Sequence, residues 1–251
     1  MPRIIAVMNP QIAVGKTTTV VNLAHALSSL GHQVTAIDMT ADKTLTGLLN
    51  ASLGVHGLSD VMLNDMNLAA VITQLKAGFN LVSPGTGLLD YEHIEFGSLN
   101  RAKKLKHAIA NSQVKHDDFV LIDCPSQPGL LMFNALFAAE EVLVPITPSY
   151  MSLQGLARVT DIFKRIYPSG NSLSKLWLIL TRVGSDSVKM EAIKSKVITE
   201  FPQRVFASAI AENSVIASTS YDGANIYTDQ QSDEPNDYLL LADDILYGRT
   251  L

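Results

Sequence analysis

Seven short apolar runs alternate along this chain with stretches of helical periodicity, and this alternation constrains the fold more than any other feature. The runs are rich in β-branched residues and are expected strands over residues 4–7, 34–37, 80–82, 119–122, 142–146, 176–180 and 205–210. Helical patterns cover residues 17–30, 99–110, 130–139, 153–167, 188–200 and 238–246. Such alternation predicts βαβ units with right-handed crossovers. We therefore expect an α/β fold, a doubly wound and mostly parallel sheet of about seven or eight strands with helices on both faces.

The composition agrees with a large buried sheet. Hydrophobic residues make up 47% of the 251 residues and charged residues 17%, which suits strands that are covered on both faces. No linker-like segment divides the chain, so we expect one domain over residues 1–251. The sequence lacks a signal-peptide pattern and a run of 18 apolar residues, and its single cysteine excludes an internal disulfide. These features predict a cytoplasmic protein.

The first expected strand leads directly into a loop of the phosphate-binding type. Residues 9–19 read Asn-Pro-Gln-Ile-Ala-Val-Gly-Lys-Thr-Thr-Thr, and a helical pattern follows them. Backbone N–H groups at a helix start, an ammonium and a hydroxyl are the groups that bind a polyphosphate and Mg²⁺. We expect Lys16 to bind the β and γ phosphates and Thr17 to bind Mg²⁺. The remaining expected phosphate contacts are the loop residues Val14, Gly15 and Thr18. The alternative is an ordinary corner between a strand and a helix.

A carboxylate ends the fourth expected strand. Asp123 follows the apolar run 119–122, at the sheet edge where the loops 9–16, 38–44 and 123–129 are expected to converge. Beside a phosphate-binding loop, such a carboxylate typically orients the water shell of Mg²⁺. We therefore predict Asp123 as the second metal-site residue, with a simple helix cap as the alternative. The expected fold is that of a P-loop NTPase, and the expected cofactors are ATP or ADP with Mg²⁺.

Longer motifs carry a family resemblance. Residues 118–136 read Asp-Phe-Val-Leu-Ile-Asp-Cys-Pro through Gly-Leu-Leu to Asn-Ala-Leu, and a matching strand and helix follow over 138–156. The spacing of Ile210, Asn213 and Gly223 before the closing helix is similar too. Over nearly the whole chain the sequence resembles the ParA/MinD (Soj-like) ATPases, and most of all their partition branch.

The resemblance implies a function and partners. Members of this family position plasmids, chromosomes or other cargo, so we expect a nucleotide-dependent switch that forms a homodimer on binding ATP. A ParB-like or cargo adaptor protein is the expected partner. The resemblance also places Asp38 in the first switch segment and Asn213 at the nucleotide.

The phosphate-binding loop departs from the family pattern. The family carries a lysine where this chain has Gln11, and two glycines where it has Ile12 and Ala13. That lysine reaches the phosphates of the partner subunit in the family's ATP-sandwich dimer. Gln11 donates hydrogen bonds but carries no charge, so about 1.5–3 kcal/mol of charge-assisted bonding is expected to be lost.

The first switch departs as well. The family has Asp-x-Asp after the second strand, and this chain retains Asp38 but has Thr40 in the second place. The Thr40 hydroxyl can hold a water but cannot act as a base near neutral pH. Asp42 would share a face with Thr40 if the segment were extended.

These departures affect the residues expected to take part in hydrolysis. The catalytic positions are Lys16, Asp38, Gln11 and Thr40. A general base contributes about 10²- to 10⁴-fold to a rate, and cationic stabilisation of phosphoryl transfer about 10³- to 10⁵-fold. We therefore expect ATP turnover to be low or absent. The alternative is a pseudo-ATPase, a scaffold or regulator of the same fold that binds partners without significant turnover.

The charges argue against DNA binding by the C-terminal part. The net charge is −5, but residues 205–251 contain one basic residue against eight acidic ones, a net −7. Non-specific DNA binding requires cations that neutralise phosphates, and here Glu212 and Val215 occupy the positions that are often basic in the family. The remaining DNA candidates are Lys103, Lys104 and Lys106, or Lys164 and Arg165; the alternative is a solvated helix face. The single cation in the last seven residues predicts no membrane-binding helix.

Overall fold

A central sheet of eight strands organises the computed structural model, which describes residues 1–51, 54–94, 99–148, 150–166, 175–184, 187–212 and 237–251. The strand order is β3-β4-β2-β5-β1-β6-β7-β8. The strands are β1 (Arg3–Val7), β2 (Val34–Asp38), β3 (Ile72–Gln74), β4 (Asn80–Val82), β5 (Phe119–Asp123), β6 (Glu141–Ile146), β7 (Lys175–Val183) and β8 (Val205–Ala211). Neighbouring strands are parallel except for the antiparallel pair β3 and β4. The predicted mostly parallel sheet is therefore confirmed.

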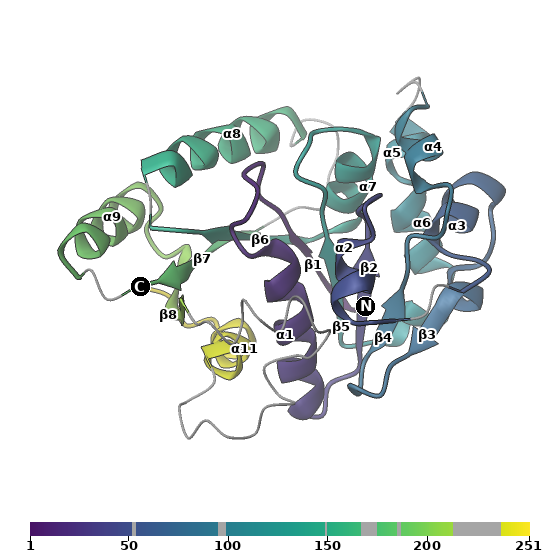
Figure 1. The fold of residues 1–251 in the computed structure, drawn as a ribbon, viewed down its shortest axis with the longest axis horizontal. Helices are drawn as coiled ribbons and strands as arrows, with labels where there is room; N and C mark the ends of the chain where they lie inside the picture. Colours follow the sequence, from purple (N-terminus) through teal and green to yellow (C-terminus); the bar gives the residue numbers. More distant parts are fainter. Residues whose placement is uncertain (52–53, 95–98, 149, 167–174, 185–186, 213–236) are drawn as a thin grey trace.

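Helices cover both faces of the sheet (Figure 1). They are α1 (Lys16–Ser29), α2 (Thr44–Leu48), α3 (Leu58–Asn64), α4 (Leu88–Glu92), α5 (Leu99–Ala102), α6 (Lys104–Ala110), α7 (Leu130–Ala138), α8 (Tyr150–Ile166), α9 (Ser187–Glu200) and α11 (Asp237–Tyr247). Helices α1, α2 and α11 pack on one face, and α3 to α9 pack on the other. Within the described part of the chain, no helix has the length and apolarity that a bilayer crossing requires.

Strand β5 shows why the sheet forms. Its five residues are all buried, and successive side chains of a strand point to opposite faces. Phe119 and Leu121 belong to the core beneath α1 and α11, whereas Val120 and Ile122 belong to the core beneath α7. An uninterrupted apolar run is therefore the pattern that a central strand of such a sheet requires.

The structure differs from the sequence expectations at β3, at residues 99–110 and at the short helices α2, α3 and α4, which were not predicted. Strand β3 was not predicted, because its three residues are half-buried or exposed and show no apolar pattern. The single helix expected over residues 99–110 is wrong, since α5 ends at Ala102 and α6 begins after Lys103. The start of α6 is held from outside the segment, because the Leu105 N–H donates to the Asn134 side chain of α7 at 3.2 Å. Periodicity within residues 99–110 contains no sign of that contact.

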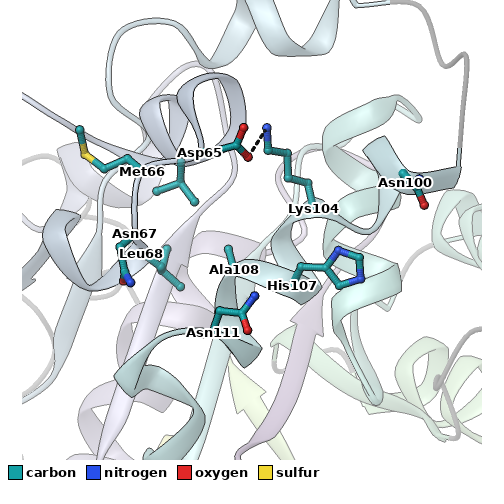
Figure 2. A pocket seen from close by; sticks show the side chains of 10 residues that line it. Asp65, Met66, Asn67, Leu68, Asn100, Lys104, His107, Ala108 and Asn111 are labelled. Carbon is teal, nitrogen blue, oxygen red and sulfur yellow. Dashed lines mark ion pairs between the residues drawn. The ribbon is translucent and has the colours of Figure 1, made fainter.

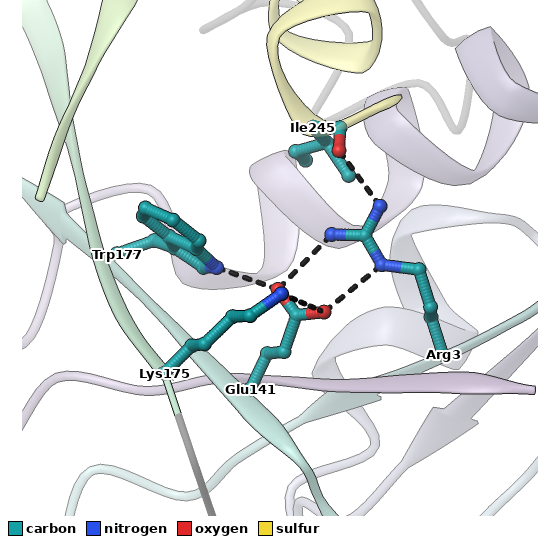
Figure 3. A network of polar contacts seen from close by, with 5 residues as sticks. All are labelled: Arg3, Glu141, Lys175, Trp177 and Ile245. Carbon is teal, nitrogen blue, oxygen red and sulfur yellow. Dashed lines mark hydrogen bonds and ion pairs between the residues drawn. The ribbon is translucent and has the colours of Figure 1, made fainter. Parts of the chain in front are cut away.

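A buried carboxylate joins the strand starts to the C-terminal helix (Figure 3). The Arg3 guanidinium donates to both oxygens of Glu141, at 2.9 and 3.0 Å, and the Trp177 indole N–H also donates to Glu141. Arg3 further donates to the Ile245 carbonyl of α11 at 2.7 Å. Burial opposes ionisation of Glu141, but the bonds from Arg3 and Trp177 hold the pKa of its carboxyl below the ordinary value. The network therefore fastens β1, β6, β7 and α11 together.

We predict that Glu141→Gln lowers the free energy of unfolding by about 2 kcal/mol near neutral pH, because hydrogen bonds to a charged group contribute about 1.5–3 kcal/mol. The depressed pKa of the folded state means that this contribution is present above the unfolded pKa of about 4.3 and is lost as the pH falls through the folded value. Urea unfolding of both proteins at pH 7 and in acid measures the difference, which should shrink in acid. The exposed Glu191→Gln on α9 is the control and should change stability by less than about 0.5 kcal/mol. A decrease in the free energy of unfolding of Glu141→Gln that is the same at pH 7 and in acid would contradict the expectation.

Candidate functional site

Three loops enclose a cavity at the carboxyl ends of the central strands. The lining comes from the loop between β1 and α1 together with the first residues of α1, from residues 40–44 after β2 and from residues 124–127 after β5. Residues of α2, α4 and α7 complete the wall. The cavity has a volume of about 850 Å³, within the range of about 300–1,000 Å³ that small-molecule and cofactor sites occupy. The predicted convergence of the three loops is therefore confirmed.

Lys16 is the buried cation of this cavity. It begins α1, and its ammonium donates to the Gln11 carbonyl at 2.9 Å and to the Ser126 hydroxyl at 2.7 Å. Burial lowers the pKa of Lys16, while the nearby Asp123 carboxylate opposes that change. The ammonium thus bridges the loop before α1 and the loop after β5, where it is available to an anion in the cavity.

The loop before α1 contains two residues in the left-handed region. Gly15 has φ 89° and Ala13 has φ 58°, and this region favours glycine because a Cβ meets the following carbonyl. The end of β7 holds the loop: the Thr181 hydroxyl donates to the Val14 carbonyl at 2.9 Å, and the Arg182 guanidinium donates to the Ala13 carbonyl at 3.1 Å. Sequence reasoning missed Thr181 and Arg182, and no motif marks them.

We predict that Ala13→Gly stabilises the protein by about 1 kcal/mol, because alanine with positive φ is strained and glycine is not. Chemical denaturation measures the change. The matched control is Ala41→Gly in the neighbouring loop, where φ is not positive and glycine should leave stability unchanged or lower. Equal effects of the two substitutions would contradict a role for the left-handed backbone.

Thr17 and Asp123 form the candidate metal site. The Thr17 hydroxyl donates to Asp123 Oδ2 at 2.8 Å, and Asp123 Oδ1 is buried without a hydrogen-bond partner in the described structure. Burial raises the pKa of Asp123 to about 7, and the charge of Asp38 adds to this. A buried carboxylate oxygen without a partner is costly unless a ligand satisfies it, and Mg²⁺ binds through carboxylates, hydroxyls and water. The residues present therefore fit Mg²⁺.

Asp38 is fully engaged by its own chain. Its Oδ1 accepts from the Thr40 N–H at 3.0 Å and the Thr40 hydroxyl at 2.6 Å. Its Oδ2 accepts from the Thr46 N–H at 2.9 Å and the Thr46 hydroxyl at 2.7 Å. Asp38 thus ties the end of β2 to α2, and it holds the first switch in shape.

The structure bears on two expectations for the first switch. The Thr40 hydroxyl, which can hold a water, donates its single proton to Asp38 and accepts from the Thr44 N–H at 2.9 Å, so only its second lone pair remains for a water. Asp42 would share a face with Thr40 only in an extended segment. The segment is not extended, because the Lys43 N–H donates to the Thr40 carbonyl at 3.0 Å and closes a turn.

Gln11 lies beside helix α8 of the same chain. Its N–H donates to the Asn9 side chain at 2.9 Å, and a Cβ built on Gly155 of α8 would lie 3.5 Å from Gln11 Oε1. Asn213, the other nucleotide residue that the resemblance suggested, lies outside the described residues. Gln11 therefore occupies the family's lysine position with its side chain against α8.

The basic segment around α5 and α6 borders a second cavity of about 360 Å³ (Figure 2). Lysines proposed for DNA have partners within the protein. Lys104 forms an ion pair with Asp65 at 3.0 Å, and the Lys103 ammonium lies 5.6 Å from the centre of the Phe137 ring. Lys164 on α8 is exposed, and the side chain of Arg165 lies outside the described residues. The positive charge of α5 and α6 is thus partly neutralised.

Comparisons with known proteins identify the family. A family model described as an AAA domain matches residues 2–175. The chromosome partitioning protein ParA of Caulobacter vibrioides is 30% identical over 222 residues, which is 84% of this chain and 81% of the relative. The chain belongs to the ParA/MinD family. Another member of this family, the sporulation initiation inhibitor protein Soj of Bacillus subtilis, is 27% identical over 98% of both chains.

A solved structure extends the likeness to the fold. Cobyrinic acid a,c-diamide synthase from Mycobacterium smegmatis has a TM-score of 0.83 and 25% identity over 100% of this chain and 98% of its own, and it was solved with ADP and magnesium. The same enzyme has also been solved with an ATP analog and magnesium. This chain is thus a ParA/MinD protein whose fold is shared by an enzyme that binds an adenine nucleotide.

Proposed function

We propose that this ParA/MinD protein binds ATP with Mg²⁺ in a single P-loop domain spanning residues 1–251 and acts as a nucleotide-dependent dimeric switch in plasmid or chromosome partitioning or cargo positioning. One observation carries the proposal: Lys16 and Thr17 line one cavity, and Thr17 donates to Asp123, whose other carboxylate oxygen is buried without a hydrogen-bond partner in the described structure. The names of the partition relatives and the ADP and magnesium in the solved enzyme support it.

Each residue has a proposed task. Lys16 binds the β and γ phosphates, and Thr17 and Asp123 hold Mg²⁺ and its water shell. When bound, Mg²⁺ supplies charge neutralisation at the phosphates. Asp38 keeps the first switch in shape through its four hydrogen bonds. The other proposed nucleotide contacts are Val14, Gly15, Thr18 and Asn213.

Hydrolysis is proposed to be weak. Gln11 carries no charge to present to a partner's phosphates. The proton of the Thr40 hydroxyl is donated to Asp38 at 2.6 Å, so Thr40 is a poor replacement for an aspartate that aligns an attacking water. The protein would then hold its nucleotide for long periods between turnovers.

The proposed partners follow from the same family. We propose a homodimer that forms on ATP binding and a ParB-like or cargo adaptor protein that recognises it. Non-specific DNA is a weaker proposal for this chain, because Lys104 is paired with Asp65 and Lys103 lies over Phe137. Salt-dependent retention by DNA that disappears on charge reversal of Lys103, Lys104 and Lys106 would support the DNA proposal.

A second function belongs to a different class. A scaffold or regulator would bind partners without significant turnover and use nucleotide, if any, for structure. The observation that favours it is the loop itself, where Ala13 adopts φ 58° without glycine and Gln11 packs towards α8.

Thermal unfolding with ATP and Mg²⁺ tests the proposed function. At a ligand concentration about 100 times the Kd, binding adds about 2.7 kcal/mol of stability, which corresponds to a rise in Tm of about 5–10 °C for a chain of this size. The same measurement with ATP and EDTA should give a smaller rise, since Mg²⁺ is then removed. An unchanged Tm with ATP and Mg²⁺ at millimolar concentrations would count against nucleotide binding.

A further inference from the structure

Helix α4 contacts α7 through two consecutive side chains. The Tyr91 hydroxyl donates to the Arg101 carbonyl at 2.6 Å and accepts from the buried Asn134 amide of α7 at 3.4 Å. The next residue, Glu92, accepts the Leu131 N–H at 2.7 Å through its Oε2. Tyr91 thus contacts the middle of α7, and Glu92 contacts its start.

Glu92 supplies the side-chain cap that the N-terminus of α7 does not receive from the residue before it. The first four N–H groups of a helix have no partner within it, and the residue before α7 is Gly129, which has no side chain to supply one. The Glu92 carboxylate takes over this task at Leu131, the second residue of the helix, and its charge also suits the positive end of the helix.

Glu92 also explains the glycine. Gly129 has an extended backbone, with φ −166° and ψ −171°, which any residue adopts, so its conformation does not require glycine. The contact with Glu92 requires glycine for lack of space, because a Cβ on Gly129 would lie 2.7 Å from Glu92 Cδ and closer still to Oε1. Gly129 and Glu92 are therefore a matched pair, since the missing side chain makes room for the carboxylate.

This contact borders the nucleotide cavity. Glu92 and Leu131 both line it, together with Ser126 and Gln127 from the segment that precedes α7. Ser126 is the residue whose hydroxyl accepts from Lys16 at 2.7 Å. Holding the first turn of α7 therefore holds the end of the loop that carries Ser126.

We propose that Glu92 is a positioning residue of the nucleotide site, which acts by fixing the start of α7 and thereby the loop 124–129. This inference rests on the proposed ATP binding. Without the carboxylate, nucleotide binding has to order this loop first, and an apparent Kd rises by the inverse of the fraction that is already ordered. Glu92 lies outside the phosphate-binding and Asp123 motifs, and its role comes from the contact alone.

Three variants of α4 test the proposal by titration with Mg²⁺–ATP. Glu92→Ala should raise the Kd about tenfold, which is the middle of the range for losing a helix cap. Glu92→Gln keeps an oxygen that can accept from Leu131 and should stay within about threefold of the parent. Asp90→Ala removes an exposed carboxylate from the same helix and should leave the Kd unchanged.

Hydrogen exchange of the nucleotide-free proteins gives a second readout that does not need ATP. A peptide covering residues 126–133 should exchange faster in Glu92→Ala than in the parent or in Glu92→Gln, while a peptide from β5 should exchange at the parent's rate. Faster exchange everywhere would show general destabilisation and would overturn the proposal. An unchanged peptide 126–133 would overturn it as well.

A double-mutant cycle isolates the pair. Gly129→Ala should displace the Glu92 carboxylate and raise the Kd about as much as Glu92→Ala, and the double variant should be no worse than either single one. Effects that add would show independent roles and contradict the proposal. If the parent itself does not bind Mg²⁺–ATP, the proposed function fails; if the parent binds and Glu92→Ala binds equally well, this inference fails alone.

Discussion

Replacing Lys16 by alanine is expected to weaken Mg²⁺–ATP binding by at least about 100-fold. The ammonium is buried and bonded only to Gln11 and Ser126 among the contacts that the structure describes, so it can turn to a phosphate without breaking an ion pair. Charge-assisted hydrogen bonds contribute about 1.5–3 kcal/mol each, and two of them account for a factor of 100 or more in Kd. Isothermal titration of the parent and the variant measures the change.

Two further variants separate charge from fold in this test. Lys16→Gln keeps a hydrogen-bond donor without charge and should bind between the parent and Lys16→Ala. Lys115→Ala removes an exposed lysine far along the chain and should bind as the parent does. Thermal unfolding without nucleotide shows whether the variants are folded. Binding by Lys16→Ala within threefold of the parent would refute the assignment of this loop.

Restoring two family residues together is expected to raise ATP turnover by at least about 100-fold. The double variant Gln11→Lys with Thr40→Asp adds a cation and a carboxylate, and such groups contribute about 10³- to 10⁵-fold and 10²- to 10⁴-fold in phosphoryl transfer and general-base catalysis. The substitution at position 40 should also lower stability, because the new carboxylate replaces a hydroxyl that donates to the buried Asp38 at 2.6 Å. The Tm of the variant should therefore fall although its turnover rises. Phosphate release under saturating ATP measures the rate.

The controls for this experiment use the same positions. Gln11→Glu places a charge opposite to that of lysine at this position and should not raise ATP turnover. Adding Lys16→Ala to the double variant should abolish the increase in turnover. A folded double variant that binds ATP and turns over no faster than the parent would favour the scaffold function. The expected gain would favour a switch whose catalysis is impaired at two residues.

The arrangement of the candidate nucleotide site was largely predictable because its parts are local. Gly15, Lys16 and Thr17 are consecutive, and a strand and a helix must flank them for their N–H groups and side chains to converge. Asp123 was predictable by a second rule, since polar residues after parallel strands meet at one edge of the sheet. The Thr17 hydroxyl lies 2.8 Å from Asp123 Oδ2 although 106 positions separate the two residues.

The supports of the site were not predictable. Thr181 donates to the Val14 carbonyl, which is 167 positions away in the sequence. Glu92 accepts from the Leu131 N–H at the start of α7, which is 39 positions away. Neither residue stands in a motif, and either could equally face solvent in another packing. The partner of Thr40 was not predictable either, although it is close in sequence. The neighbouring residues do not indicate whether the Thr40 hydroxyl bonds to water or to Asp38.

The sequence by itself determined the α/β class, the family and the position of the candidate phosphate-binding loop, because hydrophobic periodicity and loop chemistry are encoded in neighbouring residues. Only the tertiary structure decided which carboxylate has both oxygens hydrogen-bonded and which keeps one oxygen without a described partner. Asp38 and Asp123 each end a buried strand, yet Asp38 accepts four hydrogen bonds and Asp123 Oδ1 accepts none that the structure describes. That difference depends on where α2 packs, and the packing of a helix depends on the whole core beneath it.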